Sequence, residues 1–156
     1  MKQIYKLSYL RKSMNKSDKI EIMAPVGNFE NLITAINAGA DSVYFGVGKL
    51  NMRARAALNF TIDDLKEIVE ICSKKNVKTY LTLNIVVYDN EISQIKAIID
   101  AAKKYGVNAV IASDIAVISY ACEKNMEVHL STQVNASNIE SVKFYSKYAD
   151  VIVLAR

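Results

Sequence analysis

The sequence of 156 residues contains one proline, one histidine, two cysteines, five glycines and no tryptophan. So little proline and glycine excludes a collagen-like or low-complexity chain. Two cysteines are too few for a disulfide framework or a four-cysteine metal site, and both Cys72 and Cys122 fall on apolar stripes of helical period, so we predict two buried thiols. No apolar run approaches the roughly 20 residues that a membrane span needs. We therefore expect no membrane partner and a cytoplasmic protein.

Positive charge is concentrated at one end of the chain. The net charge is +4, but residues 1–19 carry six Lys or Arg and one Asp, which leaves the other 137 residues at −1. The charge of the main body therefore does not indicate a generally basic nucleic-acid groove, and a local patch is left open. We interpret residues 1–18 as a basic, disordered leader without the apolar core of a secretory signal. A start site placed upstream of Met14 explains the same residues equally well, and an organellar transit peptide is the less favoured alternative.

Short apolar runs alternate with longer segments of helical period over residues 19–156, which we treat as one domain. The runs lie at 20–24, 42–46, 77–83, 109–112, 128–131 and 151–154, and the helical segments at 29–38, 62–75, 92–105, 115–124 and 139–148. This alternation predicts a parallel sheet covered by helices. Residues suited to capping mark the helix ends: Asn28, Thr61 and Asn138 at the starts, and Gly39, Asn76, Gly106 and Asn125 after the ends.

A weak internal repeat favours a barrel over a doubly wound sheet. GADSVYF at 39–45 is similar to GVNAVIA at 106–112, and KNVKTYLTLN at 75–84 to KNMEVHLSTQ at 124–133, so alternate strands are alike. In a (β/α)8 TIM barrel alternate strands fill the same interior layers. A complete barrel takes about 250 residues and eight strands, so we predict a TIM-barrel-like architecture with about six βα units. Its unpaired edges would favour self-association.

Barrel enzymes place their functional residues at the carboxyl ends of strands and in the loops that follow. Applied to the predicted strands, this rule selects a mostly polar set on one rim. The set is Pro25, Gly27, Asn28, Gly46, Gly48, Asn51, Arg53, Arg55, Asn84, Ser113, Asp114, Ser131, Thr132, Gln133, Asn135 and Arg156. The opposite strand ends offer mainly Asp41, Lys78 and Glu127.

The only histidine, His129, shares a strand face with Ser131. It is either a hydrogen-bonded core histidine or a residue of the site. One histidine cannot form a typical zinc site, and we find no carboxylate at a strand or helical spacing that would assist it, so no metal is predicted. The catalytic candidates are His129, Ser131, Asp114 and Ser113, although no spacing rule unites them. No Walker motif or nucleophile elbow is present.

Arg53 and Arg55 share the long segment between the second strand and its helix. If that segment is extended, the two guanidinium groups share a face and could clamp a carboxylate or phosphate. Two solvated arginines are the alternative. As substrate-binding candidates we therefore take Asn28, Arg53, Arg55, Asn84, Gln133, Asn135 and Arg156.

These rim segments resemble peptidase family U32, the collagenase-like proteases. The matching stretches are IEIMAPVGNFENLITAINAGADSVYFGVGKLNMRARAALNF at 20–60, YLTLNIVVYDNE at 80–91, GVNAVIASDIAVI at 106–118, VHLSTQVNASN at 128–138 and VLAR at 153–156. The resemblance implies a TIM-barrel-like domain and, by the family label, a protease. Other members act in hydroxylation of tRNA or ribosomal RNA bases or of the ubiquinone ring, and several carry an iron–sulfur cluster.

The family's cysteine segment lies downstream of the matched region, so the resemblance implies a cluster only in a longer member, and no cofactor within this chain. The resemblance transfers twelve residues by position. They are Asn28, Arg53, Arg55, Asn59, Asn84, Ser113, Asp114, His129, Ser131, Gln133, Asn135 and Arg156. Three hypotheses follow: a peptidase, a component of RNA-base or quinone-ring hydroxylation, and a non-catalytic barrel fragment that acts through assembly. The substrate is then a peptide or an RNA.

Overall fold

A computed structural model describes residues 20–48 and 60–155. The predicted leader at 1–18 and the candidates Asn51, Arg53, Arg55, Asn59 and Arg156 lie outside the described residues. None of the described helices is both long enough and apolar enough to pass through a membrane.

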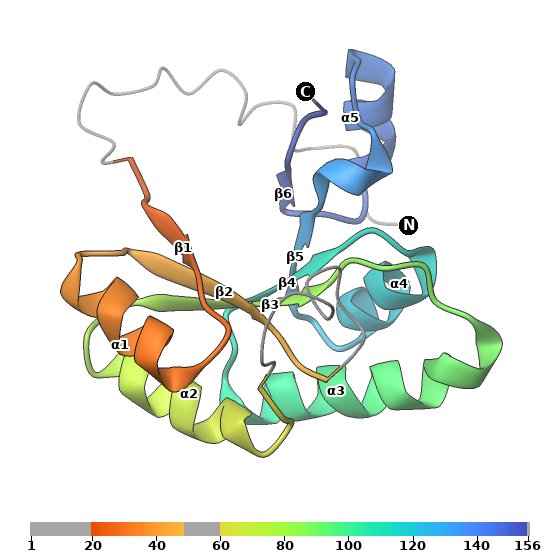
Figure 1. Cartoon of the computed structure of the whole chain (residues 1–156). Coiled ribbons are helices and arrows are strands. Elements are labelled where there is room, and N and C mark those ends of the chain that lie inside the picture. Colours follow the sequence, from red (N-terminus) through yellow and green to blue (C-terminus); the bar gives the residue numbers. More distant parts are fainter. Residues whose placement is uncertain (1–19, 49–59, 156) are drawn as a thin grey trace.

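Within the described residues, six parallel strands form one sheet in chain order. They are β1 (Met23–Pro25), β2 (Ser42–Gly46), β3 (Lys78–Leu83), β4 (Ala109–Ala112), β5 (Glu127–Leu130) and β6 (Val151–Ile152). Each strand pairs with the next one along the chain. Figure 1 shows the sheet curling into an open half-barrel with β1 and β6 at its two edges. The predicted TIM-barrel-like alternation is thus confirmed.

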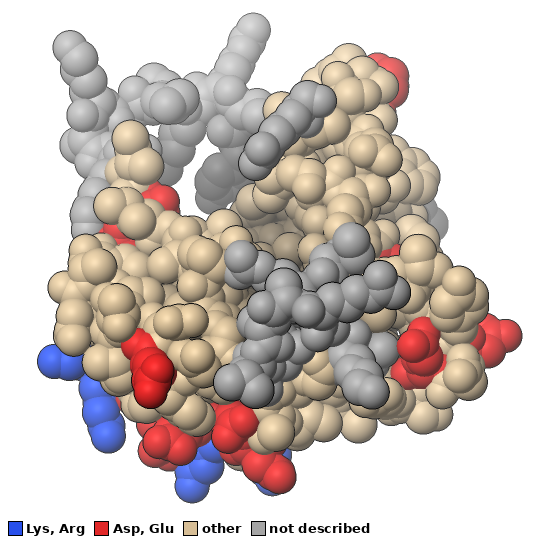
Figure 2. All heavy atoms as spheres, in the orientation of Figure 1, with Lys and Arg blue, Asp and Glu red and all other residues tan. Residues whose placement is uncertain are grey.

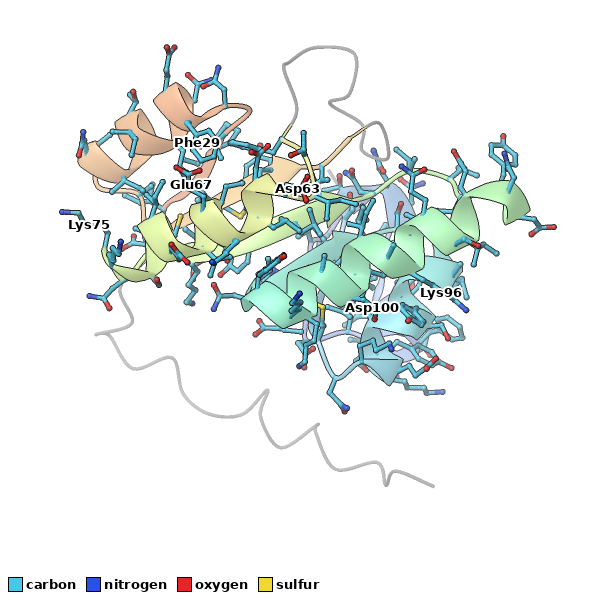
Figure 3. The ribbon with its side chains drawn as sticks, turned by 90° about the horizontal axis from the view of Figure 1, so that it is seen from below. Phe29, Asp63, Glu67, Lys75, Lys96 and Asp100 are labelled. Carbon is cyan, nitrogen blue, oxygen red and sulfur yellow. The ribbon has the colours of Figure 1, made fainter. Side chains whose placement is uncertain are left out.

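Helices connect the strands and cover the convex face of the sheet, with α2 and α3 below it and α5 at the upper right in Figure 1. They are α1 (Phe29–Asn37), α2 (Asp64–Ser73), α3 (Ile92–Tyr105), α4 (Ile115–Glu123) and α5 (Ile139–Tyr145), with short 3-10 turns η2 (Asp89–Glu91) and η3 (Thr132–Val134). The predicted bounds hold to within a few residues, and the first strand shifts most. Seen from the helix side, Figure 3 places Glu67 on α2 and Lys96 and Asp100 on α3, on the outer surface of this layer.

The hydrophobic core lies between the convex face of the sheet and the helices. Alternate strand residues such as Phe45, Leu81 and Leu130 point into it and are fully buried. From the helices, Leu65 and Ile98 meet them with at most 1% of their surface exposed. Each such side chain stabilises the fold by roughly 1.5–3 kcal/mol through the apolar surface that it removes from water. The opposite strand residues face the concave side, and these position the candidate site.

The turns that follow α1, α2, α3 and α4 each contain a residue with left-handed backbone. Asn76 and Asn125 have φ angles of 56° and 54°, and Gly39 and Gly106 have 88° and 85°. Asparagine and glycine tolerate this region because a local amide hydrogen bond, or the missing Cβ, relieves the steric cost. All four predicted residues adopt the left-handed conformation beyond their helices, although only Gly106 is itself a C-cap. The N-caps Asn28 and Asn138 are confirmed, because their side chains accept backbone N–H groups of α1 and α5. The predicted N-cap Thr61 is wrong, since Asp63 precedes α2 and the N–H of Thr61 donates to Asp64.

The prediction of two buried thiols is correct for Cys72 and wrong for Cys122. Cys72 is 1% exposed within the core, whereas Cys122 lies at the exposed end of α4. The Cys122 thiol donates to the carbonyl oxygen of Tyr148 at 3.1 Å, beyond the end of α5. The buried face of α4 consists of Val117, Ile118 and Ala121, so Cys122 lies beside that face and not on it.

Candidate functional site

The carboxyl ends of the parallel strands meet at one end of the half-barrel, toward the right of Figure 1 for β2 and β3. We call this end the rim. Most of the polar residues predicted for the site follow these strand ends in the described part of the chain. They are Asn28, Asn84, Ser113, Asp114, Ser131, Gln133 and Asn135.

An open hollow of about 390 Å³ lies on the rim between the segments that follow β3, β4 and β5. Its volume is near the lower end of the roughly 300–1,000 Å³ typical of small-molecule sites. Polar and apolar groups both contribute to its walls. The lining residues are Asn84, Ile85, Val86, Ser113, Asp114 and Gln133. Four of these six residues were predicted as site candidates from the sequence.

Asp114 fixes two elements of the rim at once. Its Oδ1 accepts the N–H of Ala116 at 2.8 Å and caps α4, while its Oδ2 accepts the N–H of Val87 at 3.1 Å. Val87 belongs to the segment that leaves β3, which is 27 residues away in sequence. The carboxylate thereby joins the loop after β3 to the loop after β4. Its hydrogen bonds make it a structural clamp of the hollow.

Ser131 is 6% exposed and connects the ends of β3 and β5. Its hydroxyl accepts the N–H of Gln133 at 3.4 Å and lies 3.5 Å from Nδ2 of Asn84. β4 lies between these two strands, so a contact between their ends requires the strong curvature of a barrel. The curvature of the sheet therefore brings together two of the predicted site residues, Asn84 and Ser131.

Two other candidates serve the backbone of the rim. The side chain of Asn28 accepts the N–H of Asn31 at 2.8 Å at the start of α1. Asn135 has a φ of 53° and ends η3 in the left-handed conformation. Both residues shape the loops after β1 and β5, and neither lines the hollow.

His129 points away from the rim. It is 8% exposed, and its Nε2 lies 2.7 Å from Oε1 of Glu127, at the amino end of β5. Its ring packs on Tyr80, with 4.8 Å between ring centroids. The expectation that no carboxylate has a suitable spacing is wrong, because residues two apart on a strand share a face and Glu127 uses that position. Within the described part of the chain, the side-chain hydrogen bonds of Ser131, His129 and Asp114 lead to other groups and do not join these three to one another.

A polar network at the amino end of the strands was missed by the sequence reasoning. We define the amino-end network as Glu21, Lys78, Tyr80, Glu127 and His129. Tyr80 donates to Oε1 of Glu21 at 2.6 Å and Lys78 to Oε2 at 2.8 Å. These bonds, from Lys78 first and then Tyr80, lower the pKa of Glu21 from 4.5 to about 2. Burial, followed by the bond to Glu21, raises the pKa of the Tyr80 phenol.

The sequence contained part of the signal for this network. Alternation places Lys78 and Tyr80 on the concave face of β3, and Glu127 and His129 on the same face of β5. The link to Glu21 crosses 57 to 59 residues of sequence. No local spacing rule predicts such a contact, because it depends on the curvature that brings alternate strands together.

The cysteines do not fit an iron–sulfur cluster. Such clusters are held by about four thiolates, whereas this chain has two cysteines in all. Burial in the core raises the pKa of the Cys72 thiol to about 11, and Cys122 donates to a backbone carbonyl on the helix layer. Among the described residues, no group of three or more His, Cys, Asp or Glu side chains could hold a metal ion.

Figure 2 shows charged side chains mainly along the lower margin of one face and at its right end, near η2, where acidic groups dominate. The described surface between these margins is largely uncharged. Of the described residues that line the hollow, none is Lys or Arg. Its one charged lining residue among those described is Asp114, whose two oxygens each accept a backbone N–H. The other polar groups are neutral and suit a ligand with neutral hydrogen-bonding edges, and Arg53 and Arg55 remain predictions for anion binding.

A parallel, barrel-type sheet with its polar hollow at the carboxyl ends of the strands defines the class of TIM-barrel proteins. The solved structure of the U32 peptidase Mk0906 has this fold, with a TM-score of 0.70 at 13% identity over 94% of this chain and 63% of that one. The model of peptidase family U32 matches residues 27–156. This chain belongs to peptidase family U32.

Curated relatives of the chain carry two kinds of name. It is 59% identical to "Collagenase" of Porphyromonas gingivalis, over 92% of this chain and 34% of that protein. It is 37% identical to "tRNA hydroxylation protein P1" of Bacillus subtilis, over 88% of this chain and 33% of that protein. The chain thus spans about a third of the length of the curated relatives that it matches.

Proposed function

We propose that this chain belongs to a protein that hydroxylates a base in RNA, and that the rim hollow binds that base. The observation that carries the proposal is the hollow itself, in which Asn84, Ser113 and Gln133 border the apolar side chains of Ile85 and Val86. Relatives named for tRNA hydroxylation support the reaction class.

The composition of the hollow suits a nucleobase. A base has two apolar faces and an edge that carries both hydrogen-bond donors and acceptors, and unpaired bases expose that edge to proteins. A carboxamide side chain offers one acceptor and two donors, so Asn84 and Gln133 match such an edge without a net charge. Ile85 and Val86 are suited to contact a flat apolar face.

We assign binding and orientation, and no redox step, to these residues. Oxygen insertion needs an oxidant, which amide and hydroxyl groups do not supply. Asp114 contributes by holding the loops after β3 and β4 at a fixed separation through its two backbone contacts. A hollow with preformed walls lowers the entropic cost of orienting the base.

Nucleoside analysis of the source organism tests this proposal. The gene is deleted, and digested tRNA and ribosomal RNA are examined by mass spectrometry. We expect loss of one hydroxylated nucleoside, restored by the complete wild-type gene and not by one carrying Asn84→Ala with Gln133→Ala. A matched control is Asn108→Ala, a change at the amino end of β4. An unaltered set of hydroxylated nucleosides in the deletion strain would overturn the proposal.

The name and the 59% identity of the Porphyromonas gingivalis relative favour a second candidate, a peptidase. Its nucleophile would be Ser131, with His129 as base and Asp114 as the orienting acid. In the described geometry His129 binds Glu127 and Asp114 binds two backbone N–H groups, so both side chains would have to turn before acting. Cleavage of gelatin that disappears in both Ser131→Ala and His129→Ala would favour this candidate over RNA binding.

A further inference from the structure

The segment that leaves β3 is held at several points along its backbone. The N–H of Val87 donates to Asp114 at 3.1 Å. The N–H of Tyr88 donates to Oε2 of Glu91 at 2.9 Å, and the N–H of Glu91 donates back to the carbonyl oxygen of Tyr88 at 2.8 Å. Reciprocal bonds of this kind fix the chain as it enters η2 and then α3.

Two side chains of this fixed segment face solvent, whereas Ile85 and Val87 pack against the core. Val86 and Tyr88 are 69% and 68% exposed. Among the described residues, no aromatic or cation–π contact includes the ring of Tyr88. An exposed ring on a restrained backbone loses little conformational freedom when a flat ligand covers it.

The two side chains lie beside the rim hollow. Val86 lines it, and Tyr88 follows two residues later, so their Cα atoms are at most about 7 Å apart. Tyr88 has an extended backbone, with φ −97° and ψ 159°. The ring of Tyr88 therefore comes two residues after the hollow-lining Val86 along an extended stretch of chain.

We propose that Tyr88, supported by Val86, is a stacking platform for the unpaired nucleotide next to the one held in the hollow. This inference rests on the proposed RNA function and names its substrate class, a single-stranded segment or loop. A duplex is excluded as the substrate of this platform, because its bases are stacked on one another and do not offer a free face. Asp114 is a positioning residue, since it acts through the N–H of Val87.

The charges around the platform make it possible to distinguish base stacking from phosphate binding by experiment. Among the described lining residues of the hollow, the one charged group is the acid Asp114. The nearest charged side chains along the segment are the acids Asp89 and Glu91. Stacking on an aromatic ring does not release counterions, whereas binding to phosphates does. Loss of the ring is therefore expected to weaken RNA binding without changing its dependence on salt.

Fluorescence anisotropy with a labelled oligouridylate and the complete chain tests the platform. Tyr88→Ala is expected to weaken binding roughly tenfold, within the range found when one base–aromatic stack is removed. Tyr88→Phe keeps the ring and should bind like the wild type. Tyr148→Ala is the matched control, because Tyr148 is also exposed, at 47%, but lies beyond α5. A duplex of the same length should show no effect of Tyr88→Ala.

The outcomes distinguish this inference from the function on which it rests. Equal affinities of Tyr88→Ala and the wild type would overturn the platform alone. If the wild type does not bind single-stranded RNA, the proposed function fails and the platform fails with it. A loss in Tyr88→Ala of binding to a gelatin peptide, with RNA binding intact, would overturn the platform in favour of a peptide site. A steeper or shallower salt slope in Tyr88→Ala would show that the ring acts through phosphate contacts, and so would also contradict it.

Discussion

The two ends of the strands use polar side chains in opposite ways. At the amino end, the charged and hydroxyl groups of Glu21, Lys78 and Tyr80 bind one another, and Glu127 binds His129. At the rim, Asp114 and Ser131 accept backbone N–H groups of the loops, and the space between these loops is left open as a hollow.

This difference shows that polar residues on a barrel-type sheet are not all candidates for chemistry. His129 is the residue that a catalytic search selects first, yet it belongs to the amino-end network and packs on Tyr80. The amide groups at the rim have less intrinsic reactivity, but they border the space that a ligand can enter. The amino end contributes stability, and the rim is where we expect binding.

The largest expected effect is on the free energy of unfolding, when tyrosine is replaced by alanine at each end of the strands. Tyr80 is 4% exposed, so Tyr80→Ala should lower the free energy of unfolding by about 3 kcal/mol through lost packing and a lost partner for Glu21. Tyr88→Ala should change it by less than about 0.5 kcal/mol, since that ring is exposed. Urea denaturation measures both values. Similar losses in the two variants would show that the ends do not differ in this way.

A smaller effect is expected at the rim clamp. Asp114→Ala removes the cap of α4 and the contact to Val87, and should cost about 1–2 kcal/mol of unfolding free energy. Asp114→Asn keeps one acceptor oxygen and should cost less than about 1 kcal/mol. Hydrogen exchange at the Val87 amide should accelerate in Asp114→Ala. If that amide stays protected, Asp114 does not hold the loop.

Acid should weaken the amino-end network. The folded pKa of Glu21 is lowered from 4.5 to about 2, so its stabilising contribution is present above pH 4.5 and is lost as the pH falls toward 2. Because Glu21 and Lys78 are partly exposed, the loss should not exceed about 1 kcal/mol. Denaturation curves of wild type and Glu21→Gln across this window measure it. A pH dependence unchanged in Glu21→Gln would contradict the assignment.

The weakest expected effect concerns the sheet edges. Ile22 and Val153 are 59% and 42% exposed beside the edge strands β1 and β6. Exposed apolar edges favour pairing between copies, so we predict weak self-association of this chain at high concentration. Val153→Lys should reduce it in sedimentation velocity experiments, and Lys147→Ala, just beyond the end of α5, serves as a control. A sedimentation coefficient that stays that of a monomer at all protein concentrations would contradict this prediction.

Much of the fold could be predicted from the sequence because its signals are local. The alternation of apolar runs with helical segments, and the cap residues Asn28, Asn76 and Asn125, depend on neighbours within a few positions. The rule that barrel sites lie after strand ends then selected four residues that line the hollow. It could not select Val86 or Tyr88, because their proposed role in binding depends on exposure to solvent. The residue type alone does not show whether an apolar side chain is exposed.

The sequence by itself determined the order of the elements, the parallel sheet and the group of polar residues at one end of it, because periodicity and strand direction follow from local pattern. Only the tertiary structure decided which of these residues have partners. Curvature joins Tyr80 to Glu21 across 59 residues and Asn84 to Ser131 across 47, and it turns His129 toward Glu127 and away from the rim. Such contacts depend on which strands the barrel brings together.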